Sequence, residues 1–289
     1  MRADELLLTA LNQRYEKYIV ELKRCKEEFS EEAIHDLRVA ARRLLALIDL
    51  LRAITAQPSL QKLRHAYKYQ LDGLDEMRDT QVMLAEISEM LESLSELAPL
   101  QKYLQKREKR LLKTAESDVL AFKVNAISRR IEIARASLAE LSLSHELAER
   151  LLAVVDDACS TVSQRMRRVD PVQPSSIHRV RIAFKKFRYT LEIIHPLLPG
   201  FPETQFKNMH NYQTAMGEIQ DVEVLLQTLD DFVTRHTDYD PLPVRQFYQK
   251  RHTELINAYI ENMNEFFTFW REKPEKPFPW DSHTVGNDT

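Results

Sequence analysis

Apolar residues recur every three or four positions along most of this 289-residue chain. That spacing is the period of one face of an α-helix, so the pattern predicts a series of amphipathic helices. Proline and short polar runs separate these helices near residues 58, 99, 169–176, 195–202 and 238–244. We expect helices over residues 3–29, 31–55, 59–76, 77 to about 98, 101–140, 145–168, 176–194, 203–218, 221–236 and 245 to about 271.

Individual residues sharpen a few of these boundaries. Ser30 precedes "EEA" and is a typical N-cap for the second helix, and Ser175 or Ser176 is expected to cap the helix that follows residue 174. Asp79 and Asp221 each precede an apolar helical run, so an N-cap is the preferred interpretation for both. The chain has only 4 glycines, far fewer than strands and hairpins would need for their turns, which favours an all-α fold.

Two of the predicted helices carry nearly the same sequence. "IHDLRVAARRLLALIDLL" occupies residues 34–51 and "IHRVRIAFKKFRYTLEII" occupies residues 177–194. A second pair follows in the same order, "LDEMRDTQVMLAEI" at 74–87 and "MGEIQDVEVLLQTL" at 216–229. The duplication predicts two helical-bundle halves related by a pseudo-two-fold axis, at residues 1–150 and 151–271. Residues 272–289 show no helical period and are expected to form an extended or disordered tail.

Helical geometry places the basic residues of each copy along one edge of its helix. His35, Arg38 and Arg42 flank the apolar stripe of the first copy. Successive members of such a row lie roughly 5–6 Å apart, which suits an anion with repeated charges better than a single carboxylate. The candidate contacts are His35, Arg38, Arg42, His178, Arg181, Lys185 and Arg188, with Arg43, Lys186, Lys68 and Lys207 as second-rank candidates. For the two histidines, direct anion contact and a structural hydrogen bond stay open alternatives.

The overall composition limits what this site can be. The formal net charge is −3, so an anion site must come from local clustering of cations. Two cysteines are too few for a disulfide framework, and no apolar run is long enough to span a membrane. With no signal peptide at the N-terminus, we expect a cytoplasmic protein without a membrane partner.

Motifs for catalysis are not found in the sequence. It contains no phosphate-binding glycine loop, no zinc-ligand spacing and no nucleophile elbow, and nothing near Asp79 or Asp221 supplies a convincing second carboxylate. We therefore expect no enzymatic activity, no cofactor and no metal site. Charged helix faces are usually solvated surface, and it is the duplication of the basic row that favours a functional site.

At these two helices the chain resembles the CHAD domain family, whose name stands for conserved histidine α-helical domain. The segments that carry the resemblance are "IHDLRVAARRLLALIDLL", "SSIHRVRIAFKKFRYTLEII", "MRDTQVML" and "MGEIQDVEVLL". The resemblance implies an all-helical fold with two halves and a basic central pore or groove. It also implies binding of inorganic polyphosphate, an association with polyphosphate granules, and partners among polyphosphate-metabolising proteins.

Three other functions compete with this interpretation. A metal-dependent polyphosphate or triphosphate hydrolase would need a carboxylate cluster. An RNA-binding module would need an aromatic stacking platform, which the sequence lacks, so we do not expect nucleic acid as a ligand. In a purely structural scaffold the basic rows would pair with acids inside the fold, as Arg188 could pair with Glu192 four residues later.

Overall fold

The computed structural model describes residues 2–141 and 146–281, and this part of the chain is α-helical, without strands. Its α-helices are α1 (Ala3–Glu28), α2 (Glu31–Ile54), α3 (Pro58–Met90), α4 (Ala98–Ala121), α5 (Val124–Leu141), α6 (Leu147–Met166), α7 (Ser175–Ile194), α8 (Thr204–Val233) and α9 (Leu242–Asn262). The predicted all-α class is confirmed for these residues. In the same part of the chain, none of the helices combines the length and apolar character that crossing a bilayer requires.

Two helices are longer than the sequence pattern suggested. α3 continues through residue 76 and α8 continues through residues 218–221, where the prediction placed boundaries. Both carry buried residues at unbroken spacings of three or four, such as Met77, Thr80 and Met83 in α3, and neither contains an interior proline. Asp79 and Asp221 therefore lie inside helices, and their interpretation as N-caps is wrong.

A single helix predicted over residues 101–140 is two helices in the structure. α4 ends at Ala121, and Phe122 adopts an extended conformation before α5 begins at Val124. The ring of Phe122 packs edge-on against Tyr18 of α1, with 6.4 Å between ring centroids. Lys26 Nζ donates to the carbonyl oxygens of Leu120 and Phe122 and so stabilises the end of α4. Tertiary packing ends the helix here without proline or glycine.

The caps of the two repeated helices differ. Ser30 caps α2 as predicted, because its side chain accepts a hydrogen bond from the backbone N–H of Ala33. At α7 the N-cap is Pro174, and neither predicted serine has this role. The hydroxyl of Ser176 instead bonds to the backbone of Asp170 and closes the preceding loop.

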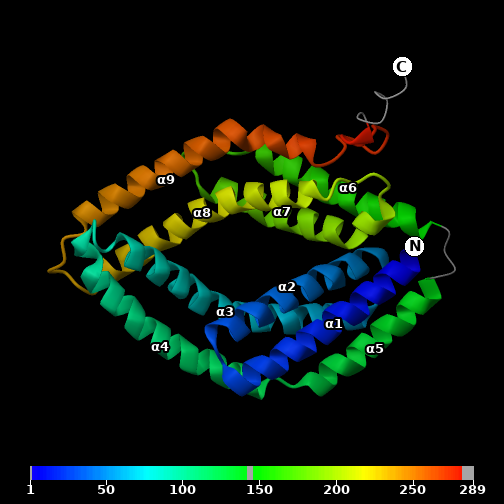
Figure 1. Cartoon of the computed structure of the whole chain (residues 1–289), viewed down its shortest axis with the longest axis horizontal. Helices are drawn as coiled ribbons and strands as arrows, with labels where there is room; N and C mark the ends of the chain where they lie inside the picture. The colour runs from blue at the N-terminus through cyan, green and yellow to red at the C-terminus, as the bar shows by residue number, and fades with distance from the viewer. Residues whose placement is uncertain (1, 142–145, 282–289) are drawn as a thin grey trace.

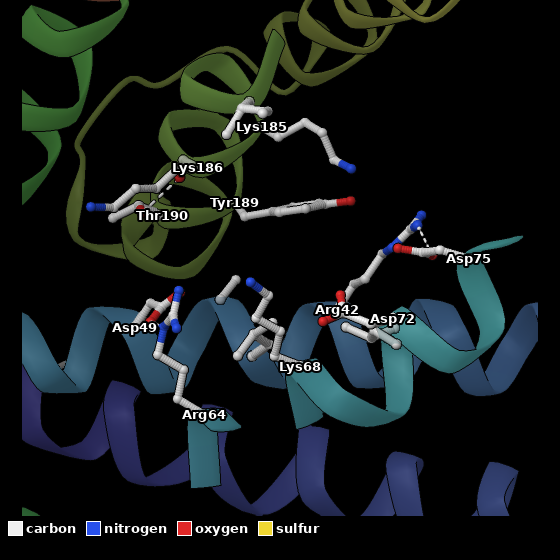
Figure 2. Close-up of a pocket in the computed structure, with 14 residues that line it drawn as sticks. Arg42, Asp49, Arg64, Lys68, Asp72, Asp75, Lys185, Lys186, Tyr189 and Thr190 are labelled. Atoms are coloured by element: carbon white, nitrogen blue, oxygen red, sulfur yellow. Dashed lines mark hydrogen bonds and ion pairs between the residues drawn. The ribbon is translucent and has the colours of Figure 1, made fainter. Parts of the chain in front are cut away.

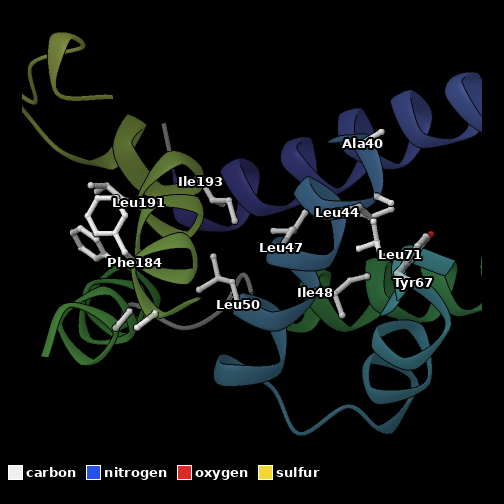
Figure 3. Close-up of a cluster of buried hydrophobic side chains, with 14 of the residues drawn as sticks. Ala40, Leu44, Leu47, Ile48, Leu50, Tyr67, Leu71, Phe184, Leu191 and Ile193 are labelled. Carbon is white, nitrogen blue, oxygen red and sulfur yellow. The ribbon is translucent and has the colours of Figure 1, made fainter. Parts of the chain in front are cut away.

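α2 and α7, the two helices with the repeated sequence, contact each other in the middle of the elongated molecule (Figure 1). α1 and α3 pack on α2, and α5 packs on α1 and α3, whereas α6 and α8 pack on α7. Leu47 and Leu50 of α2 face Ile193 of α7 across the contact (Figure 3), and all three are buried in the same core. One hydrophobic core therefore extends across both predicted halves, and α6 crosses the predicted boundary at residue 150.

A second, smaller core lies at one end of the molecule. There Met83 and Ile87 of α3 pack with Leu225 and Leu229 of α8, together with the first turns of α4 and α9. α3 and α8 are thereby held beside each other along the flank of the α2–α7 contact. α2 and α3 from the first predicted half therefore lie beside α7 and α8 from the second.

The C-terminal segment is fixed to the helical body as far as the structure describes it. α9 ends at Asn262, earlier than the predicted residue 271, and a 3₁₀ helix follows at Met263–Thr268. Trp280 is buried, and its ring stacks on Phe278 with centroids 4.6 Å apart. Residues 272–281 contain no α-helix, residues 272–277 are exposed, and the remainder of the predicted tail, 282–289, lies outside the described residues.

Candidate anion-binding site

Two cavities open along the line where α2 and α3 meet α7 and α8. The first, of about 370 Å³, we call the Lys68 cavity, and the second, of about 310 Å³, the Asp221 cavity. They share Arg42, Asp75, Ile182 and Lys185 in their linings, so they adjoin each other. Both cavities draw residues from both predicted halves of the chain.

The Lys68 cavity lies between α7 and the α2–α3 pair (Figure 2). Lys185, Lys186 and Tyr189 enter it from α7, opposite Arg42 of α2 and Lys68 of α3. Its remaining charged residues are Asp49, Arg64, Asp72 and Asp75. Arg64 is already neutralised, because its Nε donates to Asp49 Oδ1 at 2.8 Å.

The Asp221 cavity continues toward the smaller core. Arg181 and His178 of α7 line it, together with Asp79 of α3 and Gln220 and Asp221 of α8. The second carboxylate that the sequence did not show is present here, because Asp75 of α3 and Asp221 of α8 line the same cavity as Asp79. Even so, no group of three or more His, Cys, Asp or Glu side chains among the described residues is placed to hold a metal ion.

The basic row of α2 is paired with an internal acid. Arg38 Nη2 donates to Asp75 Oδ1 at 2.6 Å, and Arg42 Nη2 donates to the same oxygen at 2.9 Å. Arg38 is 4% exposed and lines neither cavity. Burial is the main cause that lowers the pKa of Arg38, followed by the positive charge of Arg42, and the Asp75 carboxylate opposes both.

The basic row of α7 has no such acid. Within residues 2–141 and 146–281, no carboxylate forms an ion pair with Arg181 or Lys185, nor with Lys68 or Lys186. The Nε of Arg181 and the Nδ1 of His178 are buried and have no hydrogen-bond partner. Burial, together with the positive charges of Arg42 and Arg181, lowers the pKa of Lys185 to about 7. Arg181 and His178 therefore line the Asp221 cavity with ring or guanidinium nitrogens that have no hydrogen-bond partner among the described residues.

The aspartates of the Asp221 cavity are poor counter-ions. Burial raises the pKa of both Asp79 and Asp221, with the charge of Asp75 adding to the shift at Asp79. Arg181 lowers both pKa values through its charge, but it forms no ion pair with either carboxylate. Their negative charge is therefore nearby without occupying the donors of Arg181.

Besides Arg38, four predicted contacts lie outside both cavities. His35 is exposed on α2, and Lys207 is exposed near the start of α8. Arg43 lines a different cavity, between α1, α2 and α7, of about 390 Å³. Arg188 Nε donates to Glu192 Oε1 at 2.8 Å, which is the internal pairing that the scaffold alternative described. The predicted contacts that line the two cavities are Arg42, Lys68, His178, Arg181, Lys185 and Lys186.

Sequence reasoning missed several lining residues. Arg64 was detectable, because it lies four residues before Lys68 and therefore on the same face of α3. Asp75 and Gln220 carry no helical signal that separates them from solvated polar residues. Their role follows from which helix lies opposite, and the pattern of one helix does not specify that.

The family assignment rests on a match of most of the chain. The sequence model of the CHAD domain family matches residues 9–230. The chain belongs to the CHAD domain family. The crystal structure of the CHAD domain from the plant Ricinus communis has the same fold, with a TM-score of 0.65, 20% sequence identity, and coverage of 92% of this chain and 89% of the plant chain. Comparison with curated proteins finds no match.

Within this CHAD domain, the match places the two cavities inside the family region. All residues that line the Lys68 and Asp221 cavities lie between residues 42 and 224. At 20% identity the plant structure supports the fold of this chain and not the role of any side chain. The function must therefore be argued from the charges and contacts of the cavities themselves.

Proposed function

We propose that this CHAD domain binds inorganic polyphosphate in the Lys68 and Asp221 cavities without catalysing a reaction. The observation that carries the proposal is the set of four cations that line the two cavities without an ion pair, Lys68, Arg181, Lys185 and Lys186. They extend over adjoining cavities, so a linear anion can meet several of them at once. A single small anion could satisfy only a few.

The chemistry of the lining suits phosphate oxygens. Arg181 offers the planar fork of its guanidinium, and the lysines act as point charges that adapt to the position of each phosphate. Polyphosphate carries repeated negative charge, and its binding to several cations releases counter-ions into solution. The affinity is therefore expected to fall steeply as the salt concentration rises.

Lys185 is the residue whose electrostatic environment changes most when a polyanion binds. In the free protein its ammonium is partly desolvated and lies near Arg42 and Arg181, so its charged form is disfavoured. A bound phosphate supplies the missing negative charge and favours the protonated lysine. Binding of the polymer therefore relieves an electrostatic cost that the folded protein carries in the two cavities.

A place at polyphosphate granules, beside polyphosphate-metabolising proteins, follows as the cellular setting of such a binding protein. The domain would hold the polymer, and a separate enzyme would build or degrade it. Asp79 and Asp221 line the same cavity, and carboxylates are the metal ligands that a hydrolase would need. A metal-dependent hydrolase is therefore the alternative that an experiment must address.

The decisive experiment is a titration of the purified chain with long-chain polyphosphate at several salt concentrations. We expect tight binding at low salt, which RNA does not displace, and no phosphate release with Mg²⁺ or Mn²⁺. The double variant Arg181→Gln, Lys185→Gln should bind about 100-fold more weakly, because it loses two charge-assisted contacts of roughly 1.5–3 kcal/mol each.

Each contrary result has a distinct meaning. The double variant Arg43→Gln, Arg188→Gln is the matched control, since it removes two predicted cations that lie outside both cavities. Equal losses in the two double variants would show that bulk charge, and not the cavities, binds the polymer. No binding of the parent chain at low salt would favour the scaffold, and metal-dependent phosphate release would favour the hydrolase.

A further inference from the structure

Asp75 holds the position of an anionic ligand between two arginines. Its Oδ1 accepts from Arg38 Nη2 and from Arg42 Nη2 at 2.6 and 2.9 Å. Two guanidinium groups around one oxygen are also the arrangement that a phosphate oxygen would take up at this place. A ligand phosphate and the Asp75 carboxylate therefore compete for the same donors.

The partners of this ion pair differ in their freedom to move. The Arg38 side chain is 5% exposed, whereas that of Asp75 is 42% exposed. Asp75 lines both cavities, and Arg38 lines neither. Asp75 can therefore turn toward solvent while Arg38 stays where α2 holds it. Departure of the carboxylate would expose Arg38 to the cavities without movement of a helix.

The second copy of the repeat carries no side chain at the matching position. The alignment places Gly217 opposite Asp75, and Arg181 opposite Arg38. A Cβ atom on Gly217 would lie 3.7 Å from Arg181 Nη2 and 3.8 Å from its Nε. Position 217 thus faces Arg181 as position 75 faces Arg38, but it supplies no carboxylate. The buried Nε atoms of Arg38 and Arg181 both have no hydrogen-bond partner in the described part of the chain, and the two arginines differ in that only Arg38 has a carboxylate on its Nη2.

We propose that Asp75 is a residue that determines specificity for the chain length of the ligand. Because Asp75 pairs with the α2 arginines, a bound polyphosphate engages the α7 cations first and the α2 arginines second. This inference rests on the polyphosphate-binding function proposed above. A short chain engages Arg181 and Lys185, where no carboxylate competes. A longer chain continues to Arg42, and only there must its phosphates displace Asp75 before they gain Arg42 and Arg38. Asp75 thereby sets the chain length from which the α2 half contributes to affinity.

Asp75→Asn tests this competition, with Glu89→Gln as the matched control. Glu89 is an exposed acid of the same helix that lines neither cavity and forms no ion pair with a cation of the described residues. Affinities for triphosphate and for long-chain polyphosphate are measured side by side. Asp75→Asn should strengthen long-chain binding by about tenfold, the scale of one charge-assisted contact that the ligand no longer has to replace. Triphosphate affinity should stay within about twofold, as should both affinities of Glu89→Gln.

The outcomes separate the inference from the function on which it rests. Equal long-chain affinities of Asp75→Asn and Glu89→Gln would overturn the competition, and so would an equal gain for triphosphate. If the parent chain binds no polyphosphate, the proposed function fails. The inference then stands only if Asp75→Asn alone acquires binding, and it fails if neither variant does. Asp75→Ala, which suits a helix interior, must repeat the result, and thermal melting must show that both variants are folded.

Discussion

The two copies of the repeated helix carry aligned basic residues, which, within the part of the chain that the structure describes, are paired with a carboxylate in one copy and unpaired in the other. On α2, Arg38 and Arg42 share the Asp75 carboxylate, and Arg38 is buried. On α7, the aligned Arg181 faces Gly217, and neither Arg181 nor Lys185 has an ion pair among the described residues. One position on the following helix, aspartate in the first copy and glycine in the second, accounts for the difference.

The comparison shows that a repeated row of cations does not by itself define a binding surface. A buried guanidinium needs a partner, because an isolated charge inside a protein is strongly disfavoured. Asp75 meets that need for Arg38 and at the same time removes it from the cavities. Arg181 is less buried and can be solvated from the Asp221 cavity, so it tolerates the absence of a carboxylate.

The largest effect should follow from making the second copy like the first. Gly217→Asp adds a carboxylate beside Arg181, where the Cβ would be in ordinary van der Waals contact. The new ion pair should occupy Arg181 and weaken both triphosphate and long-chain polyphosphate by about tenfold, the scale of one charged hydrogen bond. Isothermal titration calorimetry would measure both affinities.

Gly217→Asn is the control for this substitution, since it has nearly the same size and no charge. Its affinities should remain close to those of the parent chain. If Asn weakens binding as much as Asp does, steric crowding in the Asp221 cavity explains the loss. The contrast between the two copies would then not be electrostatic.

Much of the fold could be predicted from the helical period, and the errors have identifiable physical causes. α2 and α7 begin and end within a residue or two of the prediction, because serine or proline marks their starts and their apolar stripes are strong. α3 and α8 were divided because polar runs near Asp79 and Asp221 resemble helix starts. The break at Phe122 was missed because its cause is packing against α1.

The candidate site could be predicted only in part, for a different reason. Arg42, Arg181 and Lys185 were identified because the copies agree at those positions. Asp75 was missed because the copies disagree there, and a search for internal similarity passes over a difference. Which acids neutralise a basic row depends on the neighbouring helix, so the availability of each cation becomes visible only in three dimensions.

A smaller effect should appear in the pH dependence of polyphosphate affinity, and it should come from Lys185 on α7. The pKa of Lys185 in the free protein is about 7, and a bound phosphate raises it. Affinity should therefore be greatest below pH 7 and fall as the pH rises. Between pH 7 and 8 the protonated fraction of the free lysine drops from about one half to about one tenth, so affinity should fall about fivefold.

Lys185→Arg removes this titration, because a guanidinium stays protonated throughout the range. Its affinity should be nearly constant between pH 6 and 8.5 in the same buffers and at the same ionic strength. Proton uptake on binding, measured at pH 8 in buffers of different ionisation enthalpy, should disappear together with the pH dependence. Persistence of both in the variant would assign them to another group.

The folded protein itself should show the opposite trend with pH. Lys185 has a lower pKa in the folded state than its usual 10.5, so the unfolded chain binds more protons between pH 7 and about 10.5. The contribution of Lys185 to stability is therefore least favourable below pH 7 and improves as the pH rises through that range. In Lys185→Met, thermal melting should lack this part of the pH dependence, and an unchanged profile would contradict the lowered pKa.

The smallest effect is expected at Arg188 and Lys207, two cations of the second copy that the sequence nominated and that line neither cavity. Arg188 is paired with Glu192, and Lys207 is exposed to solvent. Exposed or internally paired charges act on a distant polyanion mainly through a salt-screened field. Arg188→Gln and Lys207→Gln should thus each change polyphosphate affinity by less than about twofold at physiological salt. A larger loss would mean that the polymer extends past the two cavities and also contacts Arg188 of α7 or Lys207 of α8.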